Sequence, residues 1–224
     1  KIVFMGTPEF SIATLEALIK NKFNILKVYT QSPKKSKRGL KINSSPIEQF
    51  CEKYKIDFNN PIKLNDKEEL NNLKKLSPDA VVVVAYGQII PKLFLGTAKF
   101  GFINVHASLL PKWRGAAPIQ RAIMNNDKKV GVSIMKIEEK LDTGPVLISK
   151  EIELDQNATH GEIEKKLSIM GANLLIESLK TLEMGSSKFI GQNHSEATYA
   201  KKIDKSETKI NWNFDSKKVL AHIH

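Results

Sequence analysis

Two polar side chains end an apolar segment, and their spacing suggests chemistry. Asn104 and His106 lie two residues apart at the end of Phe102–His106. On a strand they would project from the same face. An acid, Asp142, lies in the short segment "LDTG", where its side chain could also serve only to cap a turn. The sequence therefore presents an amide, an imidazole and a carboxylate as candidate functional groups.

Together these three groups suit acyl transfer without a covalent enzyme intermediate. An imidazole, with a reference pKa of about 6.5, can accept a proton from an attacking amine. The Asn104 amide can donate a hydrogen bond to an oxyanion, and Asp142 can orient or charge the imidazole. Ser108 lacks the G-x-S-x-G setting of a nucleophile, and the remaining histidines are too scattered to predict a metal site.

The elements that must position these groups alternate between strands and helices. We expect strands at 2–5, 24–30, 56–58, 80–86 and 102–106, with helical segments between them. The alternation predicts an α/β fold with a Rossmann-like, doubly wound, mostly parallel sheet. Ligands bind at the carboxyl ends of parallel strands, which is where Asn104 and His106 would lie.

The local signals beyond this core are of several kinds. Segments 131–139 and 144–154 alternate like strands, and a capping box at Thr159 opens a helix that continues to about Glu183. We expect Thr7 to cap the first helix, a capping box at Ser45 to open the next, and the lysine-rich stretch 31–43 to be a loop.

Composition excludes several classes of protein. The chain has 224 residues, 41% of them hydrophobic, and a formal net charge of +11. No apolar run approaches the roughly 20 residues of a membrane helix. The single cysteine, Cys51, cannot form an internal disulfide, so we expect a reducing compartment. The first turn, "GTPEF", is not a G-x-G-x-x-G dinucleotide fingerprint, which argues against a nicotinamide dehydrogenase.

Two long motifs carry a family resemblance. "INVHASLLPKWRGAAPIQRAI" with "GVSIMKIEEKLDTGPVL" resembles the folate-dependent formyltransferases. The opening "FMGTPEFS", the segment "VVVAYGQIIPK" and the "WRGAAPIQRAI" extension are similar to members that formylate methionine on initiator tRNA. The likeness covers nearly the whole chain and implies the formyltransferase type of the Rossmann-like fold.

The resemblance implies roles for named residues. Asn104, His106 and Asp142 match the catalytic trio, with 10-formyltetrahydrofolate as the formyl donor and no metal. The residues expected to contact the folate are Ser108, Leu109, Leu110, Pro111, Tyr86, Gly87, Ile89 and Pro91. We expect a monomer in the bacterial cytoplasm or an organelle matrix, with initiator methionyl-tRNA and folate as partners and no membrane.

A cationic stretch is the expected tRNA contact. The family carries an insertion here that enters the acceptor stem, and Arg38–Gly39 match its Arg-Gly, although the Ser-Pro-Lys-Lys before them departs from the usual form. Cationic loops suit contact with phosphates, whereas a solvated loop is the plainer interpretation. The residues concerned are Lys34, Lys35, Lys37, Arg38 and Lys41.

Two other functions stay open at this point. A formyltransferase of the same superfamily could act on a small amine, such as glycinamide ribonucleotide or an amino-sugar nucleotide, but it would not need five cations in one loop. A non-catalytic RNA-binding module would not need Asn104, His106 and Asp142 together.

We expect two parts along the chain. Residues 1–184 form the formyltransferase catalytic domain, and 185–224 form a linker and the start of a truncated C-terminal region that in the family leads to a β-barrel. Within the second part, we expect Trp212 to pack against the core.

Overall fold

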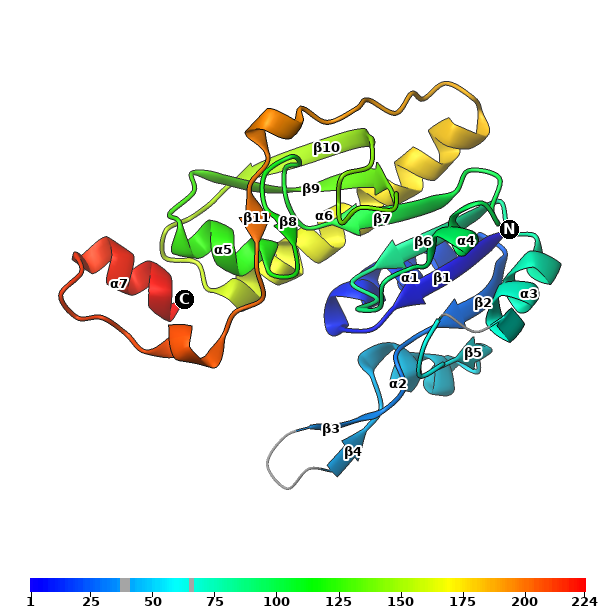
Figure 1. The fold of residues 1–224 in the computed structure, drawn as a ribbon, viewed down its shortest axis with the longest axis horizontal. Helices are drawn as coiled ribbons and strands as arrows, with labels where there is room; N and C mark the ends of the chain where they lie inside the picture. The colour runs from blue at the N-terminus through cyan, green and yellow to red at the C-terminus, as the bar shows by residue number, and fades with distance from the viewer. Residues whose placement is uncertain (37–40, 65–66) are drawn as a thin grey trace.

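The protein folds around a seven-stranded sheet with helices on both faces (Figure 1). The computed structural model describes residues 1–36, 41–64 and 67–224. The strands of the sheet are β1 (Ile2–Gly6), β2 (Ile25–Tyr29), β5 (Phe58–Asn59), β6 (Ala80–Val84), β7 (Phe102–His106), β9 (Lys129–Lys136) and β10 (Val146–Glu153).

The strand order is β10-β9-β7-β6-β1-β2-β5. Strands β5, β2, β1, β6 and β7 are parallel, whereas β9 and β10 are antiparallel to their neighbours. The chain moves outward from β1 to β2 and β5, then returns to the other side of β1 for β6 and β7. This reversal makes a topological switch point between β1 and β6, and it confirms the predicted doubly wound, mostly parallel sheet.

Helices cover the sheet because its central strands are apolar on both faces. Their bounds are α1 (Ile12–Lys20), α2 (Pro46–Tyr54), α3 (Lys67–Leu76), α4 (Lys92–Leu95), α5 (Pro118–Met124), α6 (His160–Glu183) and α7 (Ser216–Ile223), with short 3-10 turns η1 (Glu9–Ser11), η2 (His194–Glu196) and η3 (Lys205–Thr208). Val82 and Val84 of β6 pack in one core with α1, α2, α5 and α6. Val81 and Val83 face a second core with α3 and α4. None of the helices described is long and apolar enough to cross a membrane.

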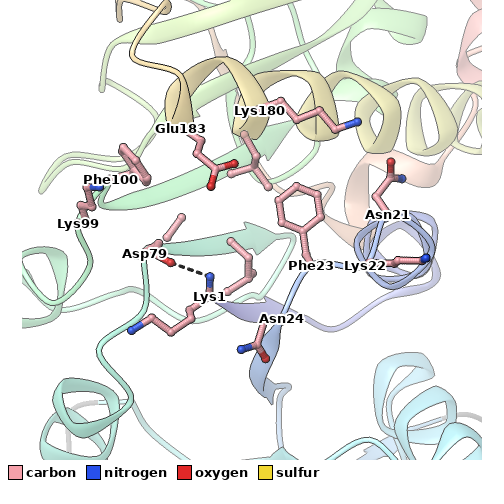
Figure 2. A pocket seen from close by; sticks show the side chains of 13 residues that line it. Lys1, Asn21, Lys22, Phe23, Asn24, Asp79, Lys99, Phe100, Lys180 and Glu183 are labelled. Carbon is pink, nitrogen blue, oxygen red and sulfur yellow. Dashed lines mark hydrogen bonds and ion pairs between the residues drawn. The ribbon is translucent and has the colours of Figure 1, made fainter.

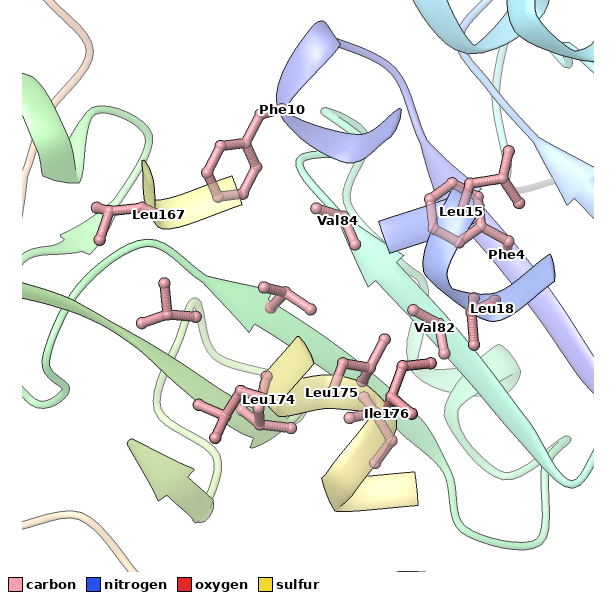
Figure 3. Packing of buried hydrophobic residues seen from close by; sticks show 14 of the residues in the cluster. Phe4, Phe10, Leu15, Leu18, Val82, Val84, Leu167, Leu174, Leu175 and Ile176 are labelled. Atoms are coloured by element: carbon pink, nitrogen blue, oxygen red, sulfur yellow. The ribbon is translucent and has the colours of Figure 1, made fainter. Parts of the chain in front are cut away.

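The long helix α6 packs on the first face of the sheet (Figure 3). Its amino end has the predicted capping box between Thr159 and Glu162, and Gly185 follows its end with φ +68°. Leu175 and Ile176 lie beside Val82 of β6 in Figure 3, and Leu174 belongs to the same core. Helix α6 therefore supports, from behind, the strands that carry the candidate residues.

Three local predictions were wrong or only partly right. Stretch 31–43 contains a hairpin, β3 (Lys34–Ser36) paired with β4 (Lys41–Asn43), rather than a loop throughout. Thr7 does not cap a helix, because its hydroxyl donates to the carbonyl of Tyr86 at 2.8 Å. Ser45 caps α2 as predicted, whereas the Glu48 side chain accepts a hydrogen bond from Asn60.

The last forty residues fold back on the sheet domain. Strand β11 (Tyr199–Ala200) pairs in parallel with β8 (Arg114–Gly115), and Arg121 of α5 forms an ion pair with Glu207 at 2.6 Å. Helix α7 lies beside α5 (Figure 1). The expectation for Trp212 was wrong, because its side chain is 73% exposed.

Close packing between α6 and β7 gives a stability prediction. A Cβ atom at the buried Gly171 would lie 2.7 Å from Cγ1 of Val105, a stiff side chain in the core. We expect Gly171→Ala to lower the free energy of unfolding by about 1–3 kcal/mol, since overpacking outweighs the helix propensity gained. Urea denaturation measures this change.

Gly161 provides the matched control on the same helix. A Cβ atom there would meet nothing within 4 Å. Gly161→Ala should therefore leave stability unchanged or raise it by up to about 1 kcal/mol. If both variants were equally stable, α6 would not approach β7 as closely as described.

Candidate active site

His106 is the buried centre of the site. It ends β7 and is only 6% exposed. Its Nε2 atom lies 3.0 Å from the carbonyl oxygen of Trp113. A carbonyl can only accept a hydrogen bond, so Nε2 must carry the proton and donate it. In the neutral ring, Nδ1 is then the unprotonated nitrogen.

Asp142 lies beside that second nitrogen. Its Oδ2 atom is 3.8 Å from Nδ1 of His106, within ion-pair range but too far for a hydrogen bond. The same oxygen accepts a hydrogen bond from the backbone N–H of Gly115 at 2.8 Å. The carboxylate can therefore stabilise positive charge on the imidazole while remaining held by the backbone.

Gly115 is required for this arrangement. Its φ is +122°, and a Cβ atom there would lie 2.7 Å from the carbonyl oxygen of Ala200. The conformation and the close approach of β11 both favour glycine. Gly115 donates its N–H to the carboxylate of Asp142, and its position depends on the close contact with Ala200 of the folded-back segment.

Asn104 lies on the same face of β7 as His106. It is half-buried and pairs in register with Val83 of β6 and Met135 of β9. The alternate residues Ile103 and Val105 face the core under α6. The predicted spacing is thus realised, and the structure brings Asn104, His106 and Asp142 to one cavity. Their roles stay a prediction.

The cavity lies at the carboxyl ends of β6 and β7, beside the switch point. Its volume is about 650 Å³. Its walls come from segments 85–90, 104–107, 115–120 and 137–142, with His160 and Glu164 at the start of α6. The walls are mainly apolar and the candidate polar groups converge at one point, as in a small-molecule site.

The residues predicted to contact folate divide into two groups. Tyr86, Gly87 and Ile89 line the cavity. Pro91 and the four residues Ser108, Leu109, Leu110 and Pro111 are not among its lining residues. Ser108 donates to the carbonyl of Lys112 at 2.6 Å, so this segment shapes the loop after β7. Folate contacts at these positions stay a prediction.

Tyr86 contributes its backbone rather than its hydroxyl. Its carbonyl accepts hydrogen bonds from Thr7 at 2.8 Å and from Gln31 at 2.9 Å, which fixes the start of the loop that walls the cavity. The ring is 2% exposed and belongs to the second core. Burial, with a smaller contribution from Glu69, raises the pKa of the Tyr86 hydroxyl, so this group stays neutral.

The described part of the cationic stretch projects from the body of the protein. Lys34, Lys35 and Lys41 lie on the backbone of hairpin β3–β4, which extends away from the sheet (Figure 1). Lys37 and Arg38 lie outside the described residues.

Among the residues described, no cluster of three or more potential metal ligands occurs.

A second hollow lies at the opposite, amino-terminal end of the parallel strands (Figure 2). Its volume is about 410 Å³, and at its edge the backbone N–H of Asp79 donates to the carbonyl of Lys1 at 2.8 Å. Lys180 and Glu183 of α6 line its other side. None of the three candidate catalytic residues reaches it.

Sequence reasoning missed the groups that hold His106 and Asp142. The carbonyl of Trp113 and the N–H of Gly115 are backbone groups. Every residue has such groups, so their roles cannot be predicted from residue type. The side chain of Gln192 bonds to the carbonyls of Asp142 and Gly144 at 2.9 and 2.7 Å. Arg114, for which substrate contact and a structural role are both plausible from sequence, is 2% exposed and bonds to Gln192.

Comparisons of sequence give consistent relatives. The formyl transferase family model matches residues 1–179. The methionyl-tRNA formyltransferase of Pelagibacter ubique is 52% identical over 225 residues, covering 100% of this chain and 73% of the relative. That of Coxiella burnetii is 47% identical over 212 residues, covering 95% of this chain and 68% of the relative.

Solved structures share the fold. An N-formyltransferase from Helicobacter canadensis, in complex with folinic acid and dTDP-3-aminofucose, has a TM-score of 0.75 at 20% identity, covering 100% of this chain and 79% of the other. A 4-N formyltransferase from Francisella tularensis also has a TM-score of 0.75 at 20% identity, covering 99% and 86%. With the sequence relatives, these findings show that the chain belongs to the formyl transferase family, among the methionyl-tRNA formyltransferases.

Proposed function

We propose that the protein transfers a formyl group from 10-formyltetrahydrofolate to the α-amino group of methionine on initiator methionyl-tRNA. The observation that carries this proposal is the meeting of Asn104, His106 and Asp142 at one cavity. The names of the sequence relatives support the acceptor. The three residues are proposed to act directly on the transfer, with no covalent enzyme intermediate.

His106 would move a proton through Nδ1. Its Nε2 donates a hydrogen bond to the carbonyl of Trp113, so Nδ1 is the nitrogen available to the reacting groups. As the amine forms its bond to the formyl carbon, it becomes acidic and releases a proton to Nδ1. The proton then passes to the leaving nitrogen as the old C–N bond breaks. Asp142, 3.8 Å away, stabilises the transient imidazolium.

Asn104 would stabilise the charge that develops on the formyl oxygen. Its amide N–H groups are donors on a side chain whose backbone is part of β7, two residues before His106. A donor carried by a strand already in place reduces the reorganisation needed as the negative charge forms. The protonated His106 can share this task, and the division between the two residues is part of the proposal.

The cavity suits the folate co-substrate. Its apolar walls, with the backbone of Gly87 and the side chain of Ile89, offer a surface for a flat ring system. We propose Tyr86, Gly87 and Ile89 as folate contacts, with Pro91 and the segment 108–111 as further contacts at the rim. The co-substrate supplies the formyl group.

We further propose the partners and organisation of the protein. The hairpin β3–β4 would contact tRNA phosphates, and the protein would act as a monomer in the cytoplasm of a bacterium or in an organelle matrix. Residues 1–184 would form the catalytic domain, and residues 185–224 would begin a region that leads to a further C-terminal part.

A formylation assay tests the function. The full-length protein is given 10-formyltetrahydrofolate with charged initiator tRNA, and glycinamide ribonucleotide serves as the rival acceptor. Formyl-methionyl-tRNA as the product supports the proposal. Formylation of the small amine alone would overturn the acceptor, and absence of transfer to either would overturn the enzymatic function.

Substitutions in the trio give the next prediction. His106→Ala should lower kcat by about 100- to 10,000-fold, because proton transfer is lost. Asn104→Ala should lower kcat by about 100- to 1,000-fold, because an oxyanion donor is lost. Steady-state kinetics measure both, and His222→Ala is the control for a histidine remote from the cavity. A His106→Ala variant with near-normal kcat would contradict the mechanism.

Hairpin β3–β4 gives a prediction on salt dependence. The double variant Lys34→Ala/Lys35→Ala should raise KM for tRNA and lower the slope of log affinity against log salt by about 2, since each lysine would neutralise one phosphate. Lys74→Ala/Lys75→Ala, on exposed positions of α3, removes the same charge elsewhere. Equal effects of the two double variants would indicate a general charge effect rather than contact by the hairpin.

A further inference from the structure

Gln192 occupies a bridging position in the site. Its Oε1 atom accepts hydrogen bonds from Nε and Nη2 of Arg114 at 3.1 and 2.7 Å. Its Nε2 atom donates to the carbonyls of Asp142 and Gly144 at 2.9 and 2.7 Å. A guanidinium can only donate and a carbonyl can only accept, so the orientation of the amide is fixed by its partners.

These bonds close a ring around Asp142. The carboxylate of Asp142 accepts from the N–H of Gly115, while its backbone carbonyl accepts from Gln192. Gln192 in turn is bound by Arg114, the residue next to Gly115. Gly115 thus holds the side chain of Asp142 and Gln192 holds its main chain, and Arg114 connects the two.

Arg114 anchors the ring through the folded-back segment. Its backbone N–H donates to the carbonyl of Thr198 at 2.9 Å, and its Nη2 also lies 2.9 Å from Nδ1 of His194. Among the described residues, no carboxylate forms an ion pair with this 2% exposed side chain. The orientation of the guanidinium therefore depends on an amide and an imidazole from residues 192–194.

The turn that carries Asp142 needs such support. Asp142 has a φ of +50°, a left-handed conformation that costs a non-glycine residue about 1–2 kcal/mol. Without the two hydrogen bonds from Gln192, the carbonyls of Asp142 and Gly144 lose their shared donor. A small displacement of the turn would change the 3.8 Å separation between Asp142 and His106.

We propose that Gln192 is a positioning residue for formyl transfer, which holds the turn of Asp142 against His106 through its amide N–H groups. This inference rests on the proposed function. If Gln192 has this role, the segment 192–200 contributes to the arrangement of the active site. This segment lies beyond residue 179, where the match to the family model ends. Gln192 itself acts only through Asp142.

The decisive variant is Gln192→Glu. The carboxylate keeps acceptors for Arg114 and adds opposite charge, so the anchoring of the segment is retained. It cannot donate to the carbonyls of Asp142 and Gly144 and would instead place an acceptor oxygen against them, so the hold on the turn is lost. We expect kcat to fall about ten- to a hundredfold, with KM for tRNA and for the folate unchanged.

Gln156→Glu is the matched control. The amide of Gln156 also donates to two backbone carbonyls, those of Asp127 and Leu154, at 3.3 and 3.5 Å. Neither residue lines the cavity. The same change of amide to carboxylate at this position should leave kcat and KM unchanged.

A readout independent of activity separates this inference from the proposed function. Hydrogen exchange at the N–H of Gly115, which donates to Asp142, should quicken in Gln192→Glu and stay unchanged in Gln156→Glu. This result is expected whatever the acceptor, so it stands even if the formylation assay fails.

The inference is overturned by any of three results. One is a kcat for Gln192→Glu within about twofold of the parent, another is a rise in KM alone, and the third is unchanged exchange at Gly115. Gln192→Ala is measured beside it and should show the same fall in kcat. If Gln192→Glu does not fold while Gln192→Ala folds with the parent kcat, the positioning role is likewise excluded.

Discussion

The hydrogen bond from Nε2 of His106 to the carbonyl of Trp113 is the interaction on which the candidate site depends. Because the carbonyl can only accept, it decides which nitrogen of the imidazole carries the proton. Nδ1 is thereby left beside Asp142. The bond also orients the ring at the end of β7, where Asn104 shares its face. The proton transfer proposed for His106 depends on this one constraint.

Three segments distant in the sequence maintain that constraint. Strand β7 supplies His106, the turn after β9 supplies Asp142, and residues 192–200 hold the loop between β7 and α5. The N–H of Trp113 donates to the side chain of Thr198 at 2.9 Å, so the residue whose carbonyl orients His106 is itself tied to the folded-back segment. A division of the chain after residue 184 therefore separates the trio from part of its support.

The sequence predicted the parts that local signals determine. Residue types and their spacing are enough to predict the valine-rich β6, the polar end of β7 and the capping box of α6. Hairpin β3–β4 was not predicted, because its lysine-rich strands lack the apolar alternation that marks a strand. Thr7 has the residue type of a helix cap, but a tertiary hydrogen bond to Tyr86 takes its hydroxyl. The roles of the Trp113 carbonyl, the Gly115 N–H and Gln192 depend on backbone atoms that only the fold brings together.

The most direct test of this arrangement is the protonation of His106 in solution. ¹⁵N NMR of protein labelled in its histidine rings, with His106 assigned by the disappearance of its signals in His106→Ala, reports which nitrogen carries the proton at mildly alkaline pH. A proton on Nε2 and an unprotonated Nδ1 are the predicted result. A proton on Nδ1 would mean that the bond to Trp113 does not form, and it would contradict the proposed route of proton transfer.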